Sequence, residues 1–252
     1  MSTSERAAYF DQWYADMRHS PVKDEVERRH LGLPQHLQST SLLTWDGLAD
    51  VTDALRLSPG DLLLDLACGR GGYGLEVAQR TGARLVGVDF SAEAVRQART
   101  QAHGLGREGD FEVGTLEATR IEDSSVDAVM VVDSIQFAEH PARAYAELAR
   151  VLRPGGRVVL TCWEVVDPDD ETQPAGLRAV DLRGGLVAAG FTGVEVVERP
   201  DWRLDERAMW EEAVTLDPGD DPALLSFRDE GVRSLRHHDA RRRVWATASS
   251  PG

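Results

Sequence analysis

The residues best suited to chemistry in this chain are a glycine-rich turn and two acids beside it. Residues 62–89 read LLLDLACGRGGYGLEVAQRTGARLVGVD, which is an apolar strand, a turn, a helix and a second strand that ends on Asp89. The glycines at 69, 71 and 72 lack a Cβ, so the backbone can approach a ligand closely. Asp89 can accept hydrogen bonds from ribose hydroxyls. This stretch therefore predicts a nucleotide-binding pocket.

The identity of the nucleotide depends on the residues before the turn. Gly69 to Gly74 fits the pattern GxGxxG literally, which is typical of NAD and FAD sites, so an NAD-linked oxidoreductase is one hypothesis. Asp65, however, lies four residues before Gly69. Its carboxylate would repel the pyrophosphate of a dinucleotide and would favour a ligand that carries positive charge.

Alternating patterns from residue 59 to about 200 identify the elements that must position these residues. Short β-branched runs alternate with stretches that carry apolar residues at helical spacing. We expect strands at 62–66, 85–89, 111–114, 128–133, 157–163, 193–198 and 244–248. We expect helices at 72–80, 92–103, 141–152 and 177–189. The alternation predicts an α/β fold with a seven-stranded, mostly parallel sheet and helices on both faces.

Two segments fall outside this alternation. Residues 1–58 are expected to form an N-terminal helical cap, and residues 59–252 the core, with a lid insertion at about 201–236 before the last strand. Trp202 and Trp210 are expected to form the lid's own core, and the arginines at 241–243 a solvated strand edge. In open α/β sheets the ligand lies beyond the carboxyl ends of the strands, where extra elements can cover it.

Three motifs, in this order, resemble the class I S-adenosylmethionine (SAM)-dependent methyltransferases, particularly their small-molecule branch. They are LLDLACGRGGYG, LVGVDFSAEAVRQA and ELARVLRPGGRVVLTCW, and together they cover about residues 58 to 165. The resemblance implies a Rossmann-like fold, SAM as cofactor and methyl transfer to N or O of a small molecule, such as a metabolite of bacterial antibiotic biosynthesis. The same fold could bind SAM and catalyse a cyclisation or decarboxylation instead. A scaffold without activity is disfavoured, because the turn and both acids are intact.

The resemblance also implies which residues hold the cofactor. The turn at 67–71 would cradle the methionine part, Asp65 its amino group, Asp89 the ribose, and Phe90 would lie against adenine. The expected cofactor residues are Asp65, Ala67, Gly69, Gly71, Asp89, Phe90, Thr115, Leu116 and Asp133. Ala67 replaces a glycine of the family pattern. Thr115 replaces an acid, and its hydroxyl should bind the adenine amino group more weakly than a carboxylate would.

The acceptor side is less well defined. Methyl transfer from a sulfonium needs alignment of the acceptor and exclusion of water more than covalent machinery. A hydroxyl acceptor would also need a base, and the candidates are Glu164, His140 and His36, although His140 could instead cap a helix. Aromatic rings can attract a sulfonium or a cationic substrate, and the expected substrate contacts are Trp13, Tyr14, Phe137 and Trp163. The run Ser39-Thr40-Ser41 could cap a helix or contact the cofactor carboxylate.

Composition limits the partners. A formal net charge of −15 argues against nucleic acid, whose phosphates are bound by clustered basic residues, and weakly favours a basic or neutral small-molecule acceptor. No apolar run predicts a signal peptide or a membrane span. Cys68 and Cys162 form no disulfide framework and no metal-ligand spacing, so we expect a cytoplasmic protein without a metal. A monomer and a homodimer both remain open.

Overall fold

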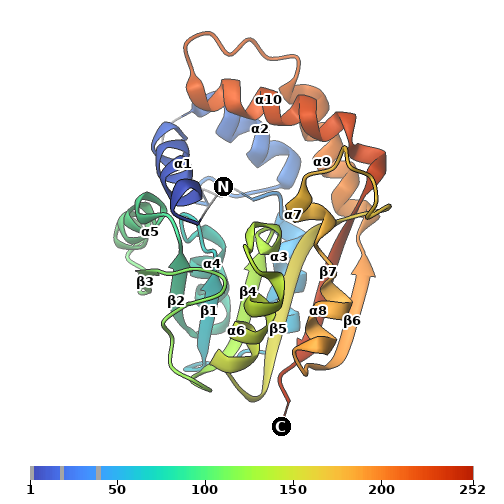
Figure 1. Cartoon of the computed structure of the whole chain (residues 1–252). Coiled ribbons are helices and arrows are strands. Elements are labelled where there is room, and N and C mark those ends of the chain that lie inside the picture. Colours follow the sequence, from blue (N-terminus) through green and yellow to red (C-terminus); the bar gives the residue numbers. More distant parts are fainter. Residues whose placement is uncertain (1–2, 18–19, 38–40, 252) are drawn as a thin grey trace.

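A single mixed β-sheet forms the centre of the protein in the computed structural model, which describes residues 3–17, 20–37 and 41–251. The sheet has seven strands in the order β3-β2-β1-β4-β5-β7-β6 (Figure 1). The strands are β1 (Leu62–Leu66), β2 (Arg84–Asp89), β3 (Asp110–Val113), β4 (Val126–Val132), β5 (Leu152–Val165), β6 (Thr192–Glu198) and β7 (Arg241–Ser249). β7 runs antiparallel to both β5 and β6, whereas the pairings among β1 to β5 are parallel. The predicted α/β fold class is confirmed.

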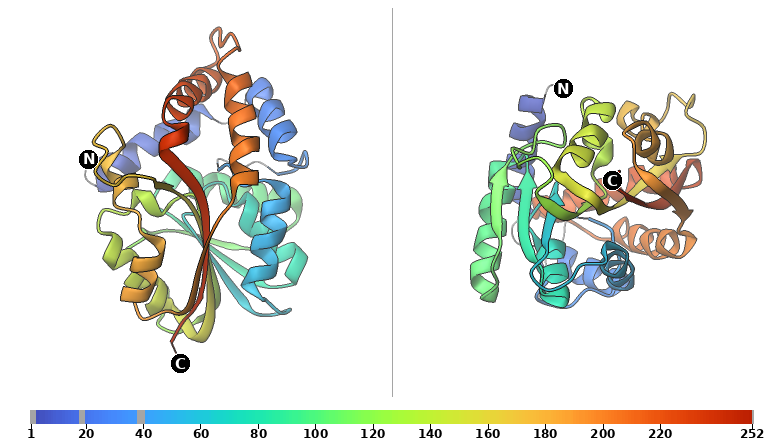
Figure 2. Two further views of the ribbon diagram at one scale, coloured as in Figure 1. Left: turned by 90° about the vertical axis from the view of Figure 1, so that its right-hand side faces the viewer. Right: turned by 90° about the horizontal axis from the view of Figure 1, so that it is seen from below.

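Helices cover both faces of the sheet and its upper edge (Figures 1 and 2). They are α1 (Thr3–Asp16), α2 (Pro21–Leu31), α3 (Trp45–Leu55), α4 (Gly72–Thr81), α5 (Ala92–Leu105), α6 (Pro141–Val151), α7 (Ala175–Arg178), α8 (Leu182–Ala188), α9 (Pro200–Ala213) and α10 (Pro222–Arg236). The prediction of one helix at 177–189 is wrong, because the chain forms α7 and α8 there. Asp181 begins the second helix by accepting a hydrogen bond from the Gly184 N–H at 2.8 Å.

Strand periodicity explains how two apolar cores form around one sheet. Successive side chains of a strand point to opposite faces. Accordingly, Met130 packs in the core under α3, α4 and α5, while its neighbours Val129 and Val131 pack in the core under α6 and α8. All three side chains are fully buried. A strand buried on both faces needs a continuous apolar run, and residues 128–132 of β4 supply it with AVMVV.

A roof of helices lies above the carboxyl ends of the parallel strands. It combines α1 and α2 with α9 and α10, which come from distant parts of the sequence (Figures 1 and 2). α2 packs against α9 and α10, and Trp13 of α1 donates a hydrogen bond to Ser226 Oγ of α10 at 3.2 Å. α3 packs instead against α4, β4 and β5, so this part of the expected N-terminal cap covers the sheet. Trp202 does not belong to a separate lid core either, because its ring packs edge-on against Trp245 of β7, with 6.2 Å between centroids.

Candidate active site

The main cavity lies between the roof and the carboxyl ends of β1, β4 and β5, where ligands bind in open α/β sheets. It has a volume of about 260 Å³. A second cavity of about 60 Å³ adjoins it beside the end of β2. Five residues line both cavities: Phe10, Tyr14, Ala67, Ser134 and Phe137. The two cavities therefore form adjoining parts of one site.

The glycine turn forms the floor of the main cavity. Gly69 and Gly71 have φ values of +52° and +76°, in the left-handed region that favours glycine. Ala67 also lies there, at φ +61°, which costs a residue with a Cβ about 1–2 kcal/mol. A Cβ on Gly74 would lie only 2.5 Å from Asp65 Oδ2. The last glycine of the motif is therefore required by the acid below the turn.

Two buried carboxyl groups flank the turn. Burial, together with the nearby Asp89, raises the pKa of Asp65 to about 8, although the Gly74 backbone N–H partly stabilises its charge. Asp89 accepts hydrogen bonds from the N–H groups of Gly69 and Ser91, both at 2.9 Å. Burial nevertheless raises the pKa of Asp89 to about 6. A ligand that carries positive charge would stabilise the ionised form of both acids.

The smaller cavity brings together five of the predicted cofactor residues. It is lined by Asp89, Phe90, Thr115 and Leu116, and by Ala67, which it shares with the main cavity. Phe10 of α1 closes it from above, with its ring 5.3 Å from Phe90 and 5.4 Å from Phe137, both in edge-to-face geometry. The N-terminal helix therefore forms one wall of the site.

The roof end of the main cavity is aromatic and charged. All four predicted substrate residues, Trp13, Tyr14, Phe137 and Trp163, line this cavity, and Trp210 and Phe227 join them. Opposite signs of charge meet there, from Lys23 and Arg233 and from Glu27 and Glu230. Burial raises the pKa of Glu27.

Lys23 lines the main cavity, although no sequence motif indicates it as a site residue. Lys23 Nζ lies 2.7 Å from Glu27 Oε1, and only 3% of the residue is exposed. It is the only lysine in a chain that otherwise uses arginine. The rarity of lysine is the one sequence signal for this residue, but it does not indicate that the side chain lies at the cavity.

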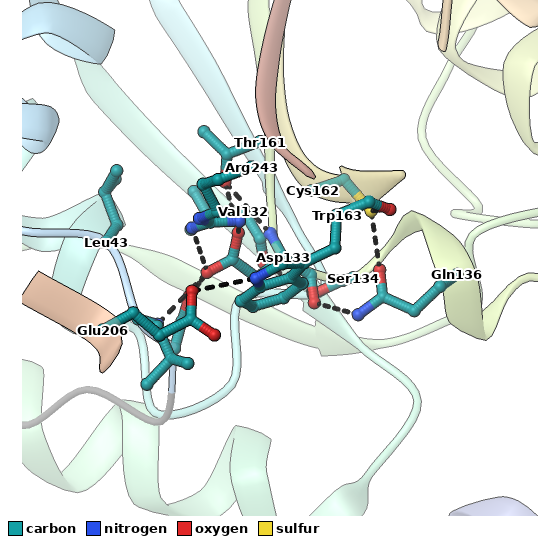
Figure 3. Close-up of polar contacts among 12 residues, drawn as sticks. Leu43, Val132, Asp133, Ser134, Gln136, Thr161, Cys162, Trp163, Glu206 and Arg243 are labelled. Atoms are coloured by element: carbon teal, nitrogen blue, oxygen red, sulfur yellow. Dashed lines mark hydrogen bonds and ion pairs between the residues drawn. The ribbon is translucent and has the colours of Figure 1, made fainter. Parts of the chain in front are cut away.

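Asp133 is the most connected acid of the site (Figure 3). Its carboxylate accepts hydrogen bonds from Thr161 Oγ1 at 2.7 Å, Ser41 Oγ at 2.5 Å and the Leu42 N–H at 3.1 Å, and it pairs with Arg243. Burial alone would raise the pKa of Asp133, but Arg243 and the hydroxyl donors lower it below its usual value. The carboxylate is thus held by protein groups, although the residue lines the main cavity.

The contacts of Asp133 bear on two predictions, one about the arginines at 241–243 and one about the run Ser39-Thr40-Ser41. The arginines at 241–243 were expected at a solvated edge, but Arg243 is fully buried. β7 lies between β5 and β6, so its inward side chains cannot reach solvent. Ser39 and Thr40 lie outside the described residues, whereas Ser41 contacts Asp133.

The three candidate bases do not line either cavity. Glu164 follows Trp163 on β5 and therefore points to the opposite face, where it pairs with Arg242 at 2.7 Å and accepts the Leu182 N–H. His140 is exposed at the start of α6. His36 lies 3.2 Å from Glu76, away from the cavity. The structure thus contradicts the prediction that these side chains face the acceptor.

Similarity to known proteins agrees with this fold and cavity. Residues 64–160 match the family model of a methyltransferase domain. Sterol 24-C-methyltransferase of Eremothecium gossypii is 31% identical over 132 residues, which cover 51% of this chain and 35% of that protein. The chain spans less than half the length of the first curated relatives that it matches.

Two solved structures share the fold over most of this chain. Phosphoethanolamine N-methyltransferase 2 of Haemonchus contortus, in complex with phosphomonomethylethanolamine and S-adenosylhomocysteine, has a TM-score of 0.72 at 20% identity, covering 85% of this chain and 54% of that one. The 4+2 cyclase SpnF has a TM-score of 0.65 at 25% identity, covering 82% and 80%. The chain therefore carries a methyltransferase domain of the class I, SAM-dependent type, and SAM is the cofactor of this class. The resemblance predicted from the motifs is confirmed.

Proposed function

We propose that the protein transfers the methyl group of SAM to a nitrogen or oxygen atom of a small-molecule acceptor, a specialised metabolite. One observation carries this proposal: a single cavity reaches from the glycine turn to an aromatic, charged roof. A donor on the floor and an acceptor under the roof would meet inside the protein. Alignment and exclusion of water are the main requirements of this displacement.

The predicted cofactor residues divide between the two cavities in a way that fits SAM. The smaller cavity would hold the adenosine part, with Asp89 on the ribose hydroxyls and Phe90 and Leu116 against adenine. The main cavity would hold the methionine part on the glycine turn, with its ammonium group toward Asp65. A cationic group there would relieve the cost of the buried acid.

The lining of the roof favours a nitrogen acceptor. Glu27 and Glu230 can hold an ammonium group, and the rings of Trp13 and Phe227 can attract it. Among the described residues that line this cavity there is no histidine to activate a hydroxyl group. An amine near its own pKa needs no strong base. Cys68 and Cys162, both free thiols, support action in a reducing compartment such as the cytoplasm.

Calorimetric titration with SAM and S-adenosylhomocysteine tests the cofactor site. We expect binding of both ligands, its loss in Asp89→Ala, and no change in Asp110→Ala, whose side chain is exposed on β3. The absence of heat with either ligand would overturn the proposal. Incubation with SAM and a panel of amines and phenols then tests the reaction, and a product heavier by one CH₂ group supports methyl transfer.

A cyclisation that uses the same fold is the second candidate. The likeness to a 4+2 cyclase over most of both chains supports it. The sulfonium would then act as a fixed charge. A product with the mass of its substrate, formed without consumption of SAM, would favour cyclisation, and loss of CO₂ from the substrate would favour decarboxylation.

A further inference from the structure

Trp163 is held on two sides by charged residues. Its ring centroid lies 4.1 Å from the guanidinium carbon of Arg243, in a cation–π contact. Its indole N–H donates to Glu206 Oε2 at 2.9 Å (Figure 3). The ring therefore cannot rotate without breaking a stacking contact, a hydrogen bond or both.

The same carboxylate holds a second wall of the cavity. Glu206 lies one turn before Trp210 on α9, and its Oε1 accepts the Trp210 indole N–H at 3.3 Å. Trp163 comes from β5 and Trp210 from the roof, and both line the main cavity. Glu206 itself is outside the lining and is 6% exposed. One buried side chain thus joins the sheet to the roof behind the acceptor end.

We propose that Glu206 is a positioning residue that fixes the indole rings of Trp163 and Trp210 and thereby sets which acceptors fit the cavity. Each of its oxygens accepts one indole N–H, and a carboxylate is the side-chain group that offers two acceptors without a donor. A glutamine of the same size would turn its NH₂ group toward one indole N–H. The part about the acceptor rests on the proposed function, whereas the part about the rings does not.

Nuclear magnetic resonance of the six indole N–H groups, in the full chain with ¹⁵N-labelled tryptophan, tests the ring part. Trp163→Phe and Trp210→Phe assign the two signals. We expect Glu206→Gln to shift both signals and speed their solvent exchange, while Glu211→Gln on the same helix, which pairs with Arg207, shifts neither. Unchanged Trp163 and Trp210 signals in Glu206→Gln would overturn the proposal.

Binding and rate measurements test the acceptor part. We expect Glu206→Gln to keep its affinity for S-adenosylhomocysteine within about twofold, and to raise the KM for a methylated acceptor about tenfold with a smaller change in kcat. Adding Trp163→Phe removes the indole N–H that conflicts with the glutamine NH₂ group. The KM of the double variant should therefore be lower than that of Glu206→Gln alone. If the affinity for S-adenosylhomocysteine falls by the same factor as the acceptor KM rises, Glu206→Gln has loosened the whole site, and the inference is refuted. If no acceptor is methylated, the proposed function fails while the spectra still decide the ring positioning.

Discussion

Asp133 Oδ1 lies 2.5 Å from Arg243 Nη1, and the two side chains are 4% and 0% exposed. The pair joins the end of β4 to β7 across a separation of 110 residues. It also fixes three residues that line the cavity, because Asp133 holds Ser41 and Leu42 while Arg243 stacks on Trp163. The ion pair is therefore part of the cavity's framework.

Removal of Arg243 should be strongly destabilising. Arg243→Ala leaves the Asp133 charge buried without its partner, which costs about 3–5 kcal/mol of unfolding free energy. Urea denaturation followed by circular dichroism measures this. Arg207→Ala is the control, because both partners of its pair with Glu211 are about half exposed, so its loss should change the stability far less. A double variant, Arg243→Met with Asp133→Asn, should recover part of the loss; similar stabilities for Arg243→Ala and Arg207→Ala would contradict this account.

Gly74→Ala should damage the cofactor floor. The new Cβ would lie 2.5 Å from Asp65 Oδ2 and 3.1 Å from Leu85 Cδ1, so the turn or the acid must move. We expect lower stability and at least tenfold weaker binding of S-adenosylhomocysteine in calorimetry, since 1.4 kcal/mol corresponds to about tenfold. Gly104→Ala is the control, because nothing lies within 4 Å of its added Cβ and alanine favours a helix. If Gly74→Ala keeps its affinity for S-adenosylhomocysteine, the turn can shift to accommodate the added Cβ, and this prediction is wrong.

The stability of the ligand-free protein should fall as pH rises from about 4 to about 8 through Asp65. Its pKa is raised to about 8 in the fold, so the native state keeps a proton that the unfolded chain, with an aspartate pKa of about 3.9, has released. Stability rises with pH only where the unfolded state binds more protons, and here the native state binds more. The side chain at position 65 cannot ionise in Asp65→Asn. From pH 6 to pH 8, the urea midpoint of the wild type should therefore fall relative to that of the variant. A difference in midpoint that stays constant with pH would refute the raised pKa of Asp65.

Binding of the cofactor should release protons from the same acid. An ammonium group near Asp65 stabilises the carboxylate, which lowers its pKa and expels the proton at neutral pH. Titrations with S-adenosylhomocysteine at pH 7 in buffers of different ionisation enthalpy report this release. We expect up to about one proton for the wild type and less for Asp65→Asn. Equal release by both proteins would place the source of the proton elsewhere.

Phe10 should contribute to cofactor binding although it lies outside the family motifs. Its ring lines both cavities and packs against Phe90 and Phe137. Phe10→Ala opens the wall of α1, which removes part of the apolar contact with the ligand. We expect S-adenosylhomocysteine to bind about tenfold more weakly, a loss of about 1.4 kcal/mol. Gln12→Ala, on the exposed side of the same helix, should bind normally. Hydrogen exchange should show α1 protected by the ligand in the wild type but not in Phe10→Ala.

The sequence predicted the local parts of the structure well. The strand at 62–66 and the helix at 72–80 are found with the expected bounds or one further residue, because glycine turns and apolar periodicity act over a few positions. Arg243 could not be predicted as buried, since its partner and the placement of β7 between β5 and β6 depend on distant contacts. Glu164 was misplaced for a different reason. In a strand, one position decides which face a side chain takes, and the motif did not fix that parity.

The position of β7 also has consequences for how the protein is made. β6 is an edge strand whose partner is β7, and the α9 and α10 segments are translated between the two. During synthesis, β6 can therefore join the sheet only after residues beyond 240 have been made. The ion pair between Asp133 and Arg243 can also form only then. Nascent chains stalled before that point should expose β6 and the underside of the roof to chaperones. The cofactor site would then mature only after residues beyond 240 have been made, although its glycine turn at 69–74 emerges much earlier.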